Sequence, residues 1–529
     1  MRSTFMGLET NKRGLYTQQS ALYTTGHNIS NANTPGYSRQ RVNMQATAGF
    51  PGVGLNTPTM PGFLGTGVEA GSIQRIRDGF VDQQFRGESN KLGYWESRSN
   101  AIAQMEDVLA EPSAYGLQQS FSDFWQSLQT LATNPENGGA RAVVVERGVA
   151  VADSFNYIHK SLSEIQTNLG KEIGVSTKNI NSILKQIGEL NKQISEVEPN
   201  GYMPNDLYDA RDNLLDQLSG YLPIEVSYEK SGGRALAIAE GTVTVKIKTN
   251  NPAQPFITVV DKSNVSQLKP VGDGTGGTDS EGNPIGNMTG FTFSGGPADG
   301  KELNVNDMQT AGVLKSLVNS YGYKDGADKV KGLYPEMLAK LDKMAQEFAK
   351  AFNEAHRSGT GTPPNNLTGK NFFEPYDIKN PGLADEEYDY SKLSAGNIIV
   401  NEAIINDHSL LAASSEAGEM GNGNNAKKLG EVLFAPLGGL EGSSVQSYYA
   451  GVIGELGVQG EQAVKMTKNS MTLLGAVSNR RDSISSVSLD EEMTDMIRFQ
   501  QAYNASARMI TVMDETLDKI INGMGVVGR

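Results

Sequence analysis

The side chains most often used for catalysis or metal binding are sparse in this chain of 529 residues. A catalytic or metal-ligating histidine needs partner side chains within hydrogen-bond or coordination reach. None of the four histidines has such a partner at helical spacing, and they stand far apart, at His27, His159, His356 and His408. Cysteine is absent, which excludes thiolate nucleophiles, disulfides and cysteine-based zinc sites. We therefore expect no metal and no cofactor.

Two further patterns could suggest chemistry, and neither has the context that the chemistry requires. Residues 272–277 read GDGTGG and match the GxGxxG fingerprint of dinucleotide-binding loops. No apolar strand precedes this stretch and no helix follows it, so we interpret it as a surface loop. The adjacent carboxylates of Glu491 and Glu492 would point in different directions on a helix, which excludes an acid–base pair. The sequence predicts no catalytic residue.

Charge and composition restrict the partners. The chain has 46 Lys and Arg against 60 Asp and Glu, a net charge of −14, which argues against binding to nucleic acid or to an anionic membrane. Residues 1–25 contain no continuous apolar stretch, so we expect neither a Sec-type signal peptide nor a membrane anchor. The length is sufficient for roughly three to four domains.

The N-terminal segment has an apolar stripe that is one residue wide. Its members recur every seven residues, as Leu8, Leu15, Leu22 and Ile29. A second seven-residue row beside the stripe consists of very small residues, which would let another backbone approach closely: Gly7, Gly14 and Ala21. A lone helix with so thin a stripe and two internal glycines should be marginal in water, so we expect it to need a partner.

The C-terminal segment has a matching stripe with the same spacing. Its members are Leu489, Met496, Tyr503, Ile510, Leu517 and Met524, supported three positions later by Phe499, Met513 and Ile520. This predicts a helix roughly 50 Å long, at 1.5 Å per residue, and Ser488 with Glu491 suggests a capping box at its start. Matched stripes at both ends predict that the termini pair as a coiled coil and that the rest of the chain is inserted between them.

The expected fold is mainly α-helical with an inserted β domain, in an elongated multidomain chain. Helical periodicity covers about 80–133, 141–159, 162–197, 205–219, 327–356 and 445–477, whereas the period falls to two within about 222–300. The chain is predicted to begin with a coiled-coil segment, 1–36, that pairs with 487–529. A helical bundle follows over 37–221, starting with an extended segment 37–79, and its last part is 441–486. Between these bundle parts we expect a β-rich insertion 222–326, a bundle helix or bridge 327–356, and a second mixed insertion 357–440.

The most distinctive local string is GHNISNANTPGYSRQRV at 26–42. Asparagines end the helix, and Pro35 and Gly36 occupy the second and third positions of a turn, which favours type II. We expect the chain to continue from the turn as an extended, basic segment. The residues that define this turn motif are Asn31, Asn33, Thr34, Pro35, Gly36 and Tyr37.

This string closely resembles the N-terminal signature of the flagellar axial proteins, which are the rod, hook and hook-associated proteins. The string SLDEEMTDMIRFQQAYNASARMITVMDETLDKIING at 488–523 looks like the C-terminal signature of the same family. Within the family, the SRQ after the turn and PNDLYDARDNLLDQLSGYLPIEVSY at 204–228 are most similar to hook-associated members. The resemblance implies a non-enzymatic structural component of the bacterial flagellum, at the junction between hook and filament, that is required for filament assembly.

The resemblance also implies partners and a location. Copies of the chain would associate in a helical or ring lattice beside the hook protein and the second junction protein, hook-associated protein 3. Export would use the flagellar type III apparatus without a cleavable signal, and a chaperone would bind the C-terminal segment. The two apolar stripes would form the assembly interface of an extracellular, secreted protein.

Three alternatives remain open at this point. A hook or rod protein would share both terminal signatures. A secreted enzyme carried on flagellar ends would need a convergent polar site within 222–440, and the sequence offers none. A cytoplasmic coiled-coil scaffold has only the absence of a signal peptide in its favour.

Overall fold

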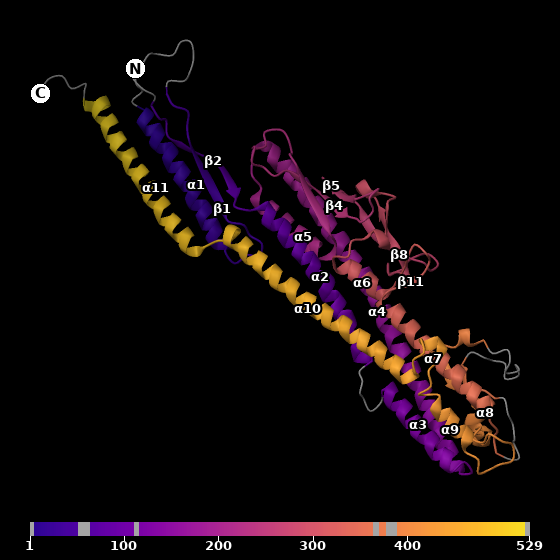
Figure 1. Cartoon of the computed structure of the whole chain (residues 1–529). Coiled ribbons are helices and arrows are strands. Elements are labelled where there is room, and N and C mark those ends of the chain that lie inside the picture. Colours follow the sequence, from indigo (N-terminus) through magenta and orange to yellow (C-terminus); the bar gives the residue numbers. More distant parts are fainter. Residues whose placement is uncertain (1–4, 51–63, 110–115, 363–369, 377–388, 524–529) are drawn as a thin grey trace.

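The computed structural model describes residues 5–50, 64–109, 116–362, 370–376 and 389–523. The molecule is a long rod in which both termini lie at one end (Figure 1). Paired helices form that end, a helical bundle with β-sheets at its side forms the middle, and a small mixed domain forms the opposite tip. The expected class, mainly α-helical with an inserted β domain, is confirmed.

The two terminal helices lie side by side, as predicted. Helix α1 spans Met6–Asn31, and α11 spans Leu489–Asp518 and continues as a π-helical turn over Lys519–Gly523. The expected capping box is wrong. Ser488 is the N-cap residue, but its side chain makes no capping hydrogen bond. Glu491 is instead drawn away by Arg39, whose Nη1 donates to its Oε2 at 2.6 Å.

An antiparallel hairpin follows α1 and lies against it. Strands β1 (Gln40–Ala46) and β2 (Val68–Arg75) pair with a bulge after Asn43. The predicted extended segment after the turn is therefore a β-strand. Because a two-stranded hairpin is barely stable alone, its packing on α1 is part of what holds it.

Four helices form the bundle: α2 (Gly79–Val108), α4 (Gly138–Val197), α5 (Asn205–Tyr221) and α10 (Val445–Ser485). The segments predicted as helices 141–159 and 162–197 are one continuous helix, because buried apolar residues follow one another along α4 without a break. The segment predicted as 80–133 contains two helices, α2 and α3 (Leu117–Thr133). Helix α4 ends where expected, with Gly201 in the left-handed region at φ +86°.

The β-rich part consists of two sheets beside α4. The first has the order β3-β4-β5-β6, with β3 Ile224–Glu229, β4 Thr242–Lys248, β5 Phe256–Asp261 and β6 Asn264–Val265. The second has the order β11-β10-β8-β7 with β9 beside β8, where β7 is Gln267–Gly272, β8 Met288–Ser294, β9 Glu302–Asn304, β10 Tyr323–Lys324 and β11 Val330–Lys331. A helix not expected from the sequence, α6 (Val313–Tyr321), joins this part to α2 and α4. The GDGTGG stretch begins at Gly272, the last residue of β7, and continues as a loop, so a strand does precede it, contrary to the expectation, although no helix follows.

The tip is built on the C-terminal half of α7 (Leu333–Arg357) and on α3. Strands β12 (Phe373–Pro375) and β13 (Ile398–Val400) and helices α8 (Glu402–Asn406) and α9 (Asn424–Glu431) complete it. Its core is a cluster of aromatic rings in edge and tilted contacts, formed by Phe121, Phe124, Phe348, Phe352, Phe372 and Phe373. Within the described residues, six short 3-10 turns connect the larger elements, at Glu198–Asn200, Gly296–Ala298, Val305–Asp307, Tyr390–Lys392, His408–Leu410 and Gly438–Leu440.

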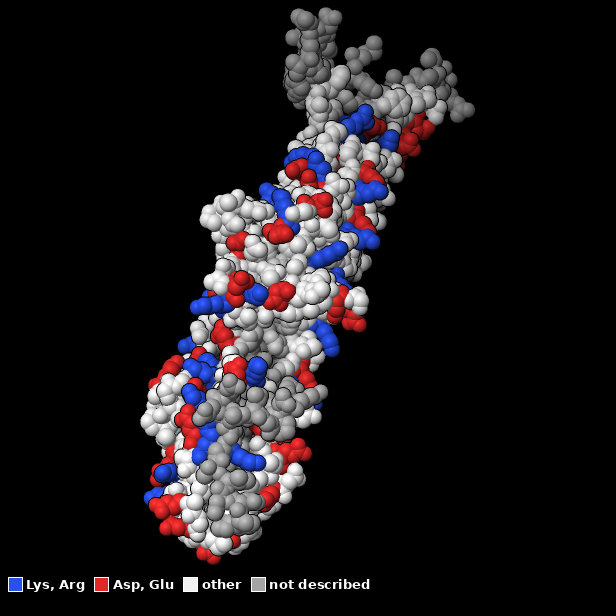
Figure 2. All heavy atoms as spheres, turned by 90° about the vertical axis from the view of Figure 1, so that its right-hand side faces the viewer, with Lys and Arg blue, Asp and Glu red and all other residues white. Residues whose placement is uncertain are grey.

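The surface mixes both signs of charge. On the face shown in Figure 2, basic and acidic side chains alternate over the length of the rod, with no extended field of one sign. Among the described residues, no three His, Asp or Glu side chains gather so that they could hold a metal ion. A search of the same residues finds no helix with the length and apolarity to cross a membrane.

We predict that His356 makes the tip sensitive to acid. The ring is buried, Nε2 accepts a hydrogen bond from the Ala412 amide at 3.0 Å, and Nδ1 therefore donates to the Lys370 carbonyl at 2.8 Å. Burial lowers the pKa of His356 to about 4. Since an unfolded histidine has a pKa near 6.5, the unfolded chain binds a proton at this histidine between about pH 6.5 and pH 4, whereas the folded tip does not. About 3 kcal/mol of stability, present at neutral pH, should be lost as the pH falls from about 6.5 to 4.

Urea unfolding between pH 7 and pH 4.5, followed by aromatic circular dichroism, measures this effect. The variant His356→Gln should show a flatter pH dependence, whereas His408→Gln, at a half-buried position, should behave as the unaltered chain. An equal acid response of His356→Gln and the unaltered chain would contradict the assignment.

Candidate assembly interface

The row of small residues on α1 faces α11. A Cβ atom added at Gly7 would lie 2.2 Å from Met513 Cε, and one added at Gly14 would lie 3.3 Å from Ser506 Oγ. Ala21, the third member, is buried. The row therefore lies against α11 as expected, but the atoms nearest to Gly7 and Gly14 belong to side chains of α11 and not to its backbone.

The apolar stripes beside this contact are only partly covered in the single chain. Leu8, Leu15, Leu22 and Ile29 of α1 are half-buried, as are Met496, Phe499, Tyr503, Ile510, Met513 and Leu517 of α11. Leu489 and Ile520 remain 48% and 44% exposed, and Met524 lies outside the described residues. One partner helix therefore does not bury the stripes.

Other large apolar side chains of this helix pair point into solvent. Tyr23 of α1 is 76% exposed, and Met493 and Ile497 of α11 are 55% and 61% exposed. These residues fall outside the seven-residue stripes, so the apolar spacing of the sequence does not indicate them. Exposed apolar surface of this extent on two adjoining helices is typical of a surface that another protein covers.

The turn motif has the expected geometry. The Tyr37 amide donates to the Thr34 carbonyl at 3.1 Å, and Gly36 has φ +78°, as the third position of a type II turn requires. Asn31 accepts a hydrogen bond from the Thr34 hydroxyl at 3.2 Å, while Asn33 is exposed. The carbonyl of Pro35 accepts from Asn213 Nδ2 at 3.3 Å, which ties the turn to α5.

Asn28 joins the turn, the hairpin and α11. Its Oδ1 accepts from the Gln40 amide at 3.0 Å and from the Tyr37 hydroxyl at 2.8 Å. Its Nδ2 donates to the Gln40 carbonyl at 2.8 Å and to Glu492 Oε2 at 3.0 Å. The side chain is buried, and both of its polar atoms are satisfied. Asn28 therefore fixes the end of α1 relative to the start of β1 and to α11.

Arg39 reinforces the same joint from the other side. Its Nε and Nη1 each donate at 2.6 Å, to Glu492 and Glu491, and its backbone amide donates to the Ser485 carbonyl at 2.8 Å. Glu491 and Glu492, which are not an acid–base pair, thus both accept hydrogen bonds from one guanidinium group. They hold the bend between α10 and α11 next to the turn motif.

The hairpin is anchored to the bundle by a buried ionic cluster. Asp212 of α5 lies 3.0 Å from Arg75, 3.2 Å from Arg77 and 3.2 Å from Arg86. Burial alone would raise the pKa of Asp212, but these guanidinium groups hold it well below the usual aspartate value. Around this centre the cluster includes Asp82, Asp209, Arg211, Asp216, Glu240 and Arg481.

The sequence contains a signal for this cluster in the spacing of its charged residues. Asp209, Asp212 and Asp216 recur at the three- and four-residue spacing of one helix face, and Arg75 and Arg77 recur at the two-residue spacing of one strand face. Such rows usually indicate solvated faces. Only the packing of α5 against the end of β2 shows that these two faces meet and exclude water.

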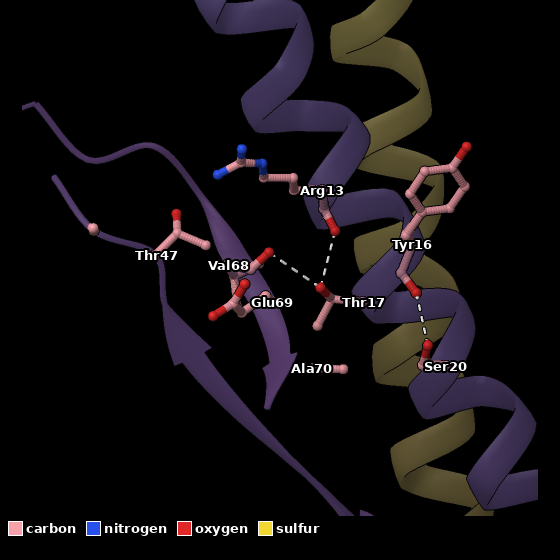
Figure 3. Close-up of a pocket in the computed structure, with 9 residues that line it drawn as sticks. Arg13, Tyr16, Thr17, Ser20, Thr47, Val68, Glu69 and Ala70 are labelled. Atoms are coloured by element: carbon pink, nitrogen blue, oxygen red, sulfur yellow. Dashed lines mark hydrogen bonds between the residues drawn. The ribbon is translucent and has the colours of Figure 1, made fainter. Parts of the chain in front are cut away.

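An open groove lies between α1 and the hairpin (Figure 3). Its volume is about 580 Å³, and Arg13 of α1 extends toward Val68 and Glu69 of the hairpin, whereas the ring of Tyr16 points away from the hairpin. Thr17 closes its floor by donating a hydrogen bond to the Val68 carbonyl at 3.2 Å.

Comparison with known families matches three parts of the chain. Residues 102–373 match the family described as flagellar hook-associated protein FlgK helical domain. Residues 8–37 match flagella basal body rod protein, and residues 481–523 match flagellar basal body rod FlgEFG protein C-terminal. The two rod matches cover α1 with its turn and α11 with the bend before it.

Individual relatives match along the whole length. Flagellar hook-associated protein 1 of Bacillus subtilis (strain 168) is 45% identical over 533 residues, which covers 100% of both chains. The protein of the same name from Escherichia coli (strain K12) is 25% identical over 549 residues, covering 96% of this chain and 98% of its own. The solved structure of the flagellar hook junction protein FlgK from Burkholderia pseudomallei has the same fold, with a TM-score of 0.58 at 14% identity, covering 76% of this chain and all of that one.

We predict that Asp212→Ala strongly destabilises the protein. The substitution leaves the guanidinium groups of Arg75, Arg77 and Arg86 buried around a missing charge, which should cost about 3–5 kcal/mol of the free energy of unfolding. Asp153→Ala, at an exposed position of α4 outside the cluster, is the control and should change stability by less than about 0.5 kcal/mol. Chemical unfolding of both purified variants measures the difference, and similar midpoints would refute a structural role for the cluster.

Proposed function

The chain belongs to the family of flagellar hook-associated protein 1, and we propose that its paired terminal helices form the interface through which copies assemble. Identity of 45% along the full length of a relative of that name carries the assignment. The chain is a structural component of the bacterial flagellum, at the junction between hook and filament. Its relatives are structural flagellar proteins.

The family match to the bundle distinguishes this role from that of a rod or hook protein. The two rod matches are confined to residues 8–37 and 481–523, the ends that axial proteins share. The helical-domain match covers 102–373, which is the body of the rod in Figure 1. The body therefore separates this chain from the other axial proteins, although the ends resemble theirs.

The incomplete burial of the terminal stripes supports the interface proposal. Leu8, Leu15, Leu22 and Ile29, with Met496, Phe499, Tyr503, Ile510, Met513 and Leu517, keep part of their apolar surface in solvent in the single chain, and Leu489 and Ile520 keep more. Burial of this surface between neighbouring copies would stabilise a lattice by about 25 cal/mol per Å². Contacts between unlike surfaces of identical copies propagate such a lattice, whereas a twofold contact would close it.

The arrangement of the rod suggests how each part is used. The terminal pair, 1–36 with 487–529, would line the tube, the bundle would surround it, and the insertions 222–326 and 357–440 would face outward. The direct neighbours would be the hook protein on one side and hook-associated protein 3 on the other. We expect neither nucleic acid nor an inserted membrane segment to take part in this assembly.

Export completes the proposal. A junction protein at the far end of the hook must leave the cell, and the flagellar type III apparatus would carry it without a cleavable signal. The exposed Met493, Ile497 and the half-covered stripe of α11 would associate prematurely in the cytoplasm. A dedicated chaperone bound to this segment would prevent that association.

We predict that Ile510→Asp abolishes filament growth but leaves the body folded. In the assembly the change would forfeit roughly 2–3 kcal/mol of apolar burial and place an unpaired carboxylate in the seam of every copy. Lys185→Asp, on an exposed face of α4 with a side chain 76% exposed, is the control and should be nearly silent. Filament counts in a strain lacking the native protein, with circular dichroism of each purified variant, decide the matter. Normal swimming, or an unfolded Ile510→Asp body, would show that the stripe is an ordinary intramolecular core.

We also predict that a fragment of residues 485–529 captures a cytoplasmic chaperone. The same fragment with Met496 and Phe499 replaced by serine should capture much less, because the two changes remove most of an apolar binding face. Affinity capture from cells that produce flagella, followed by mass spectrometry, is the measurement. If the full chain lacking 485–529 retained the chaperone, the binding site would lie elsewhere.

A further inference from the structure

Methionines differ in exposure between the body and the terminal helices. Those in the core of the body are buried, namely Met105, Met288, Met308, Met337 and Met344. On α11, by contrast, Met493 and Met509 are 55% and 46% exposed, and Met496 and Met513 are half-buried. The thioether sulfur of a methionine takes up an oxygen atom from a peroxide when the oxidant can reach it. Oxidation should therefore affect the terminal helices before it affects the core of the body.

Met513 packs into the notch that a glycine leaves in α1. A Cβ atom added at Gly7 would lie 2.2 Å from Met513 Cε, 3.4 Å from its Sδ and 3.9 Å from its Cγ. Three consecutive atoms of the side chain therefore cover the space beside Gly7. An unbranched, flexible thioether is suited to such a narrow and irregular gap. The seam between α1 and α11 thus includes a methionine sulfur.

This sulfur is also reachable from solvent. The Thr516 hydroxyl approaches Met513 Sδ at 4.0 Å in a contact that is exposed at the surface of the helix pair. The same hydroxyl donates to the Met513 carbonyl at 2.8 Å. A small peroxide can approach the sulfur from this side while both helices remain folded.

Oxidation would make the side chain polar within the seam. The peroxide transfers one oxygen atom to Sδ, the sulfur loses two electrons, and the peroxide is reduced to water or an alcohol, while no bond of the chain breaks. The new oxygen is a hydrogen-bond acceptor. Side-chain donors one turn further along α1 already bond to backbone carbonyls, Thr10 at 2.8 Å and Asn11 at 2.9 Å. A larger, polar sulfoxide therefore fits poorly in a notch that a thioether fills.

We propose that Met513 is a reversible oxidation site, at which a peroxide forms a sulfoxide that loosens the pairing of α1 with α11. A methionine sulfoxide reductase would restore the thioether and the pairing. Met493 and Met509 are more exposed and oxidise as well, but a sulfoxide at either position stays in water. The loosening is a property of the single chain and does not depend on the assembly proposal.

The consequence for assembly does rest on the proposed function. A chain that is oxidised before it assembles would present loosened ends and should enter the lattice poorly. Repair by a reductase would make the same chain competent again. Oxidation at this position would thus regulate the use of the terminal pair without altering the body.

Hydrogen–deuterium exchange of the purified full-length chain, before and after treatment with hydrogen peroxide, tests the loosening. Peptide mapping by mass spectrometry measures the sulfoxide at Met513 and, as a reference for the dose, at Met471, which is 66% exposed on α10. After oxidation the amides of α1 should exchange about fivefold faster or more, because even a modest loss of packing shifts the opening equilibrium by that factor. Exchange in α4 should be unchanged, and a methionine sulfoxide reductase should restore the original rates in α1.

Three variants locate the effect. Met513→Leu should keep the pairing and lose the response to peroxide, because leucine has a similar volume and no sulfur. Met509→Leu is the matched control: it removes a more exposed thioether from the same helix and should respond to peroxide as the unaltered chain does. Met513→Gln, which introduces a polar amide at the same position, should speed the exchange of α1 without peroxide.

Several results would overturn the proposal. One is a dose of peroxide that oxidises Met471 but not Met513, and another is a Met513 sulfoxide that leaves the exchange of α1 unchanged. Equal acceleration in Met513→Leu and the unaltered chain would place the effect at a different methionine. Exchange of α1 at the unfolded rate before oxidation would mean that no pairing exists to be loosened. Filament counts do not enter this test, so its failure would leave the junction role standing.

Discussion

The buried carboxylate of Asp212 is the point on which the orientation of the whole rod depends. It is surrounded by guanidinium groups from β2, the loop after it and α2, and the cluster extends through Asp216 to Arg481 of α10. Three regions that are distant in sequence, residues 75–86, α5 and α10, therefore meet in one cluster. A buried network of this kind contributes little net stability compared with apolar packing, but it tolerates almost no rearrangement, because any shift leaves a charge unpaired. Its effect is to fix the angle at which the hairpin and terminal helices leave the bundle.

A second device repeats along the rod: the carboxamide of a helical asparagine substitutes for a neighbouring strand. Asn28, Asn181 and Asn353 each donate to a strand carbonyl and accept from a strand amide. The device closes sheet edges without a further strand and locks each helix in register with its sheet. The body can therefore be a thin rod of small sheets and long helices and still satisfy its buried backbone groups.

Body and terminal end differ in how completely they are packed. The bundle and tip bury Phe155, Phe291 and Phe352 almost entirely, whereas the stripes of α1 and α11 remain half-covered. The body thus folds around its own core, and the ends leave apolar surface uncovered in the single chain. This division suits a component that must exist alone before it assembles, because the same side chains cannot both complete a monomer core and form a lattice contact.

The spacing of residue types along the chain was sufficient to predict the terminal helices and the turn between α1 and β1. Seven-residue spacing predicted the two terminal helices and their pairing, the glycine row predicted the close contact, and Pro35 with Gly36 predicted the type II turn. The turn signature also indicated the family, because all of its residues stand close together between Asn31 and Tyr37. The sequence overstated the number of helices where α4 runs unbroken, since a short interruption in the apolar stripe does not end a helix whose backbone hydrogen bonds continue.

Only the tertiary structure showed which charged and polar residues are buried and which partners they have. Asp212 and Arg75 look like solvated charges in the sequence, and Glu491 looks like half of a capping box. Their roles follow from long-range packing, which brings α5 against β2 and Arg39 against α11. The edge position of β3 is likewise invisible in its sequence, because whether a strand has one neighbour or two is a property of the sheet. Apolar periodicity therefore determined the helices and their pairing, whereas the burial and partners of charged and backbone groups depend on segments hundreds of residues away.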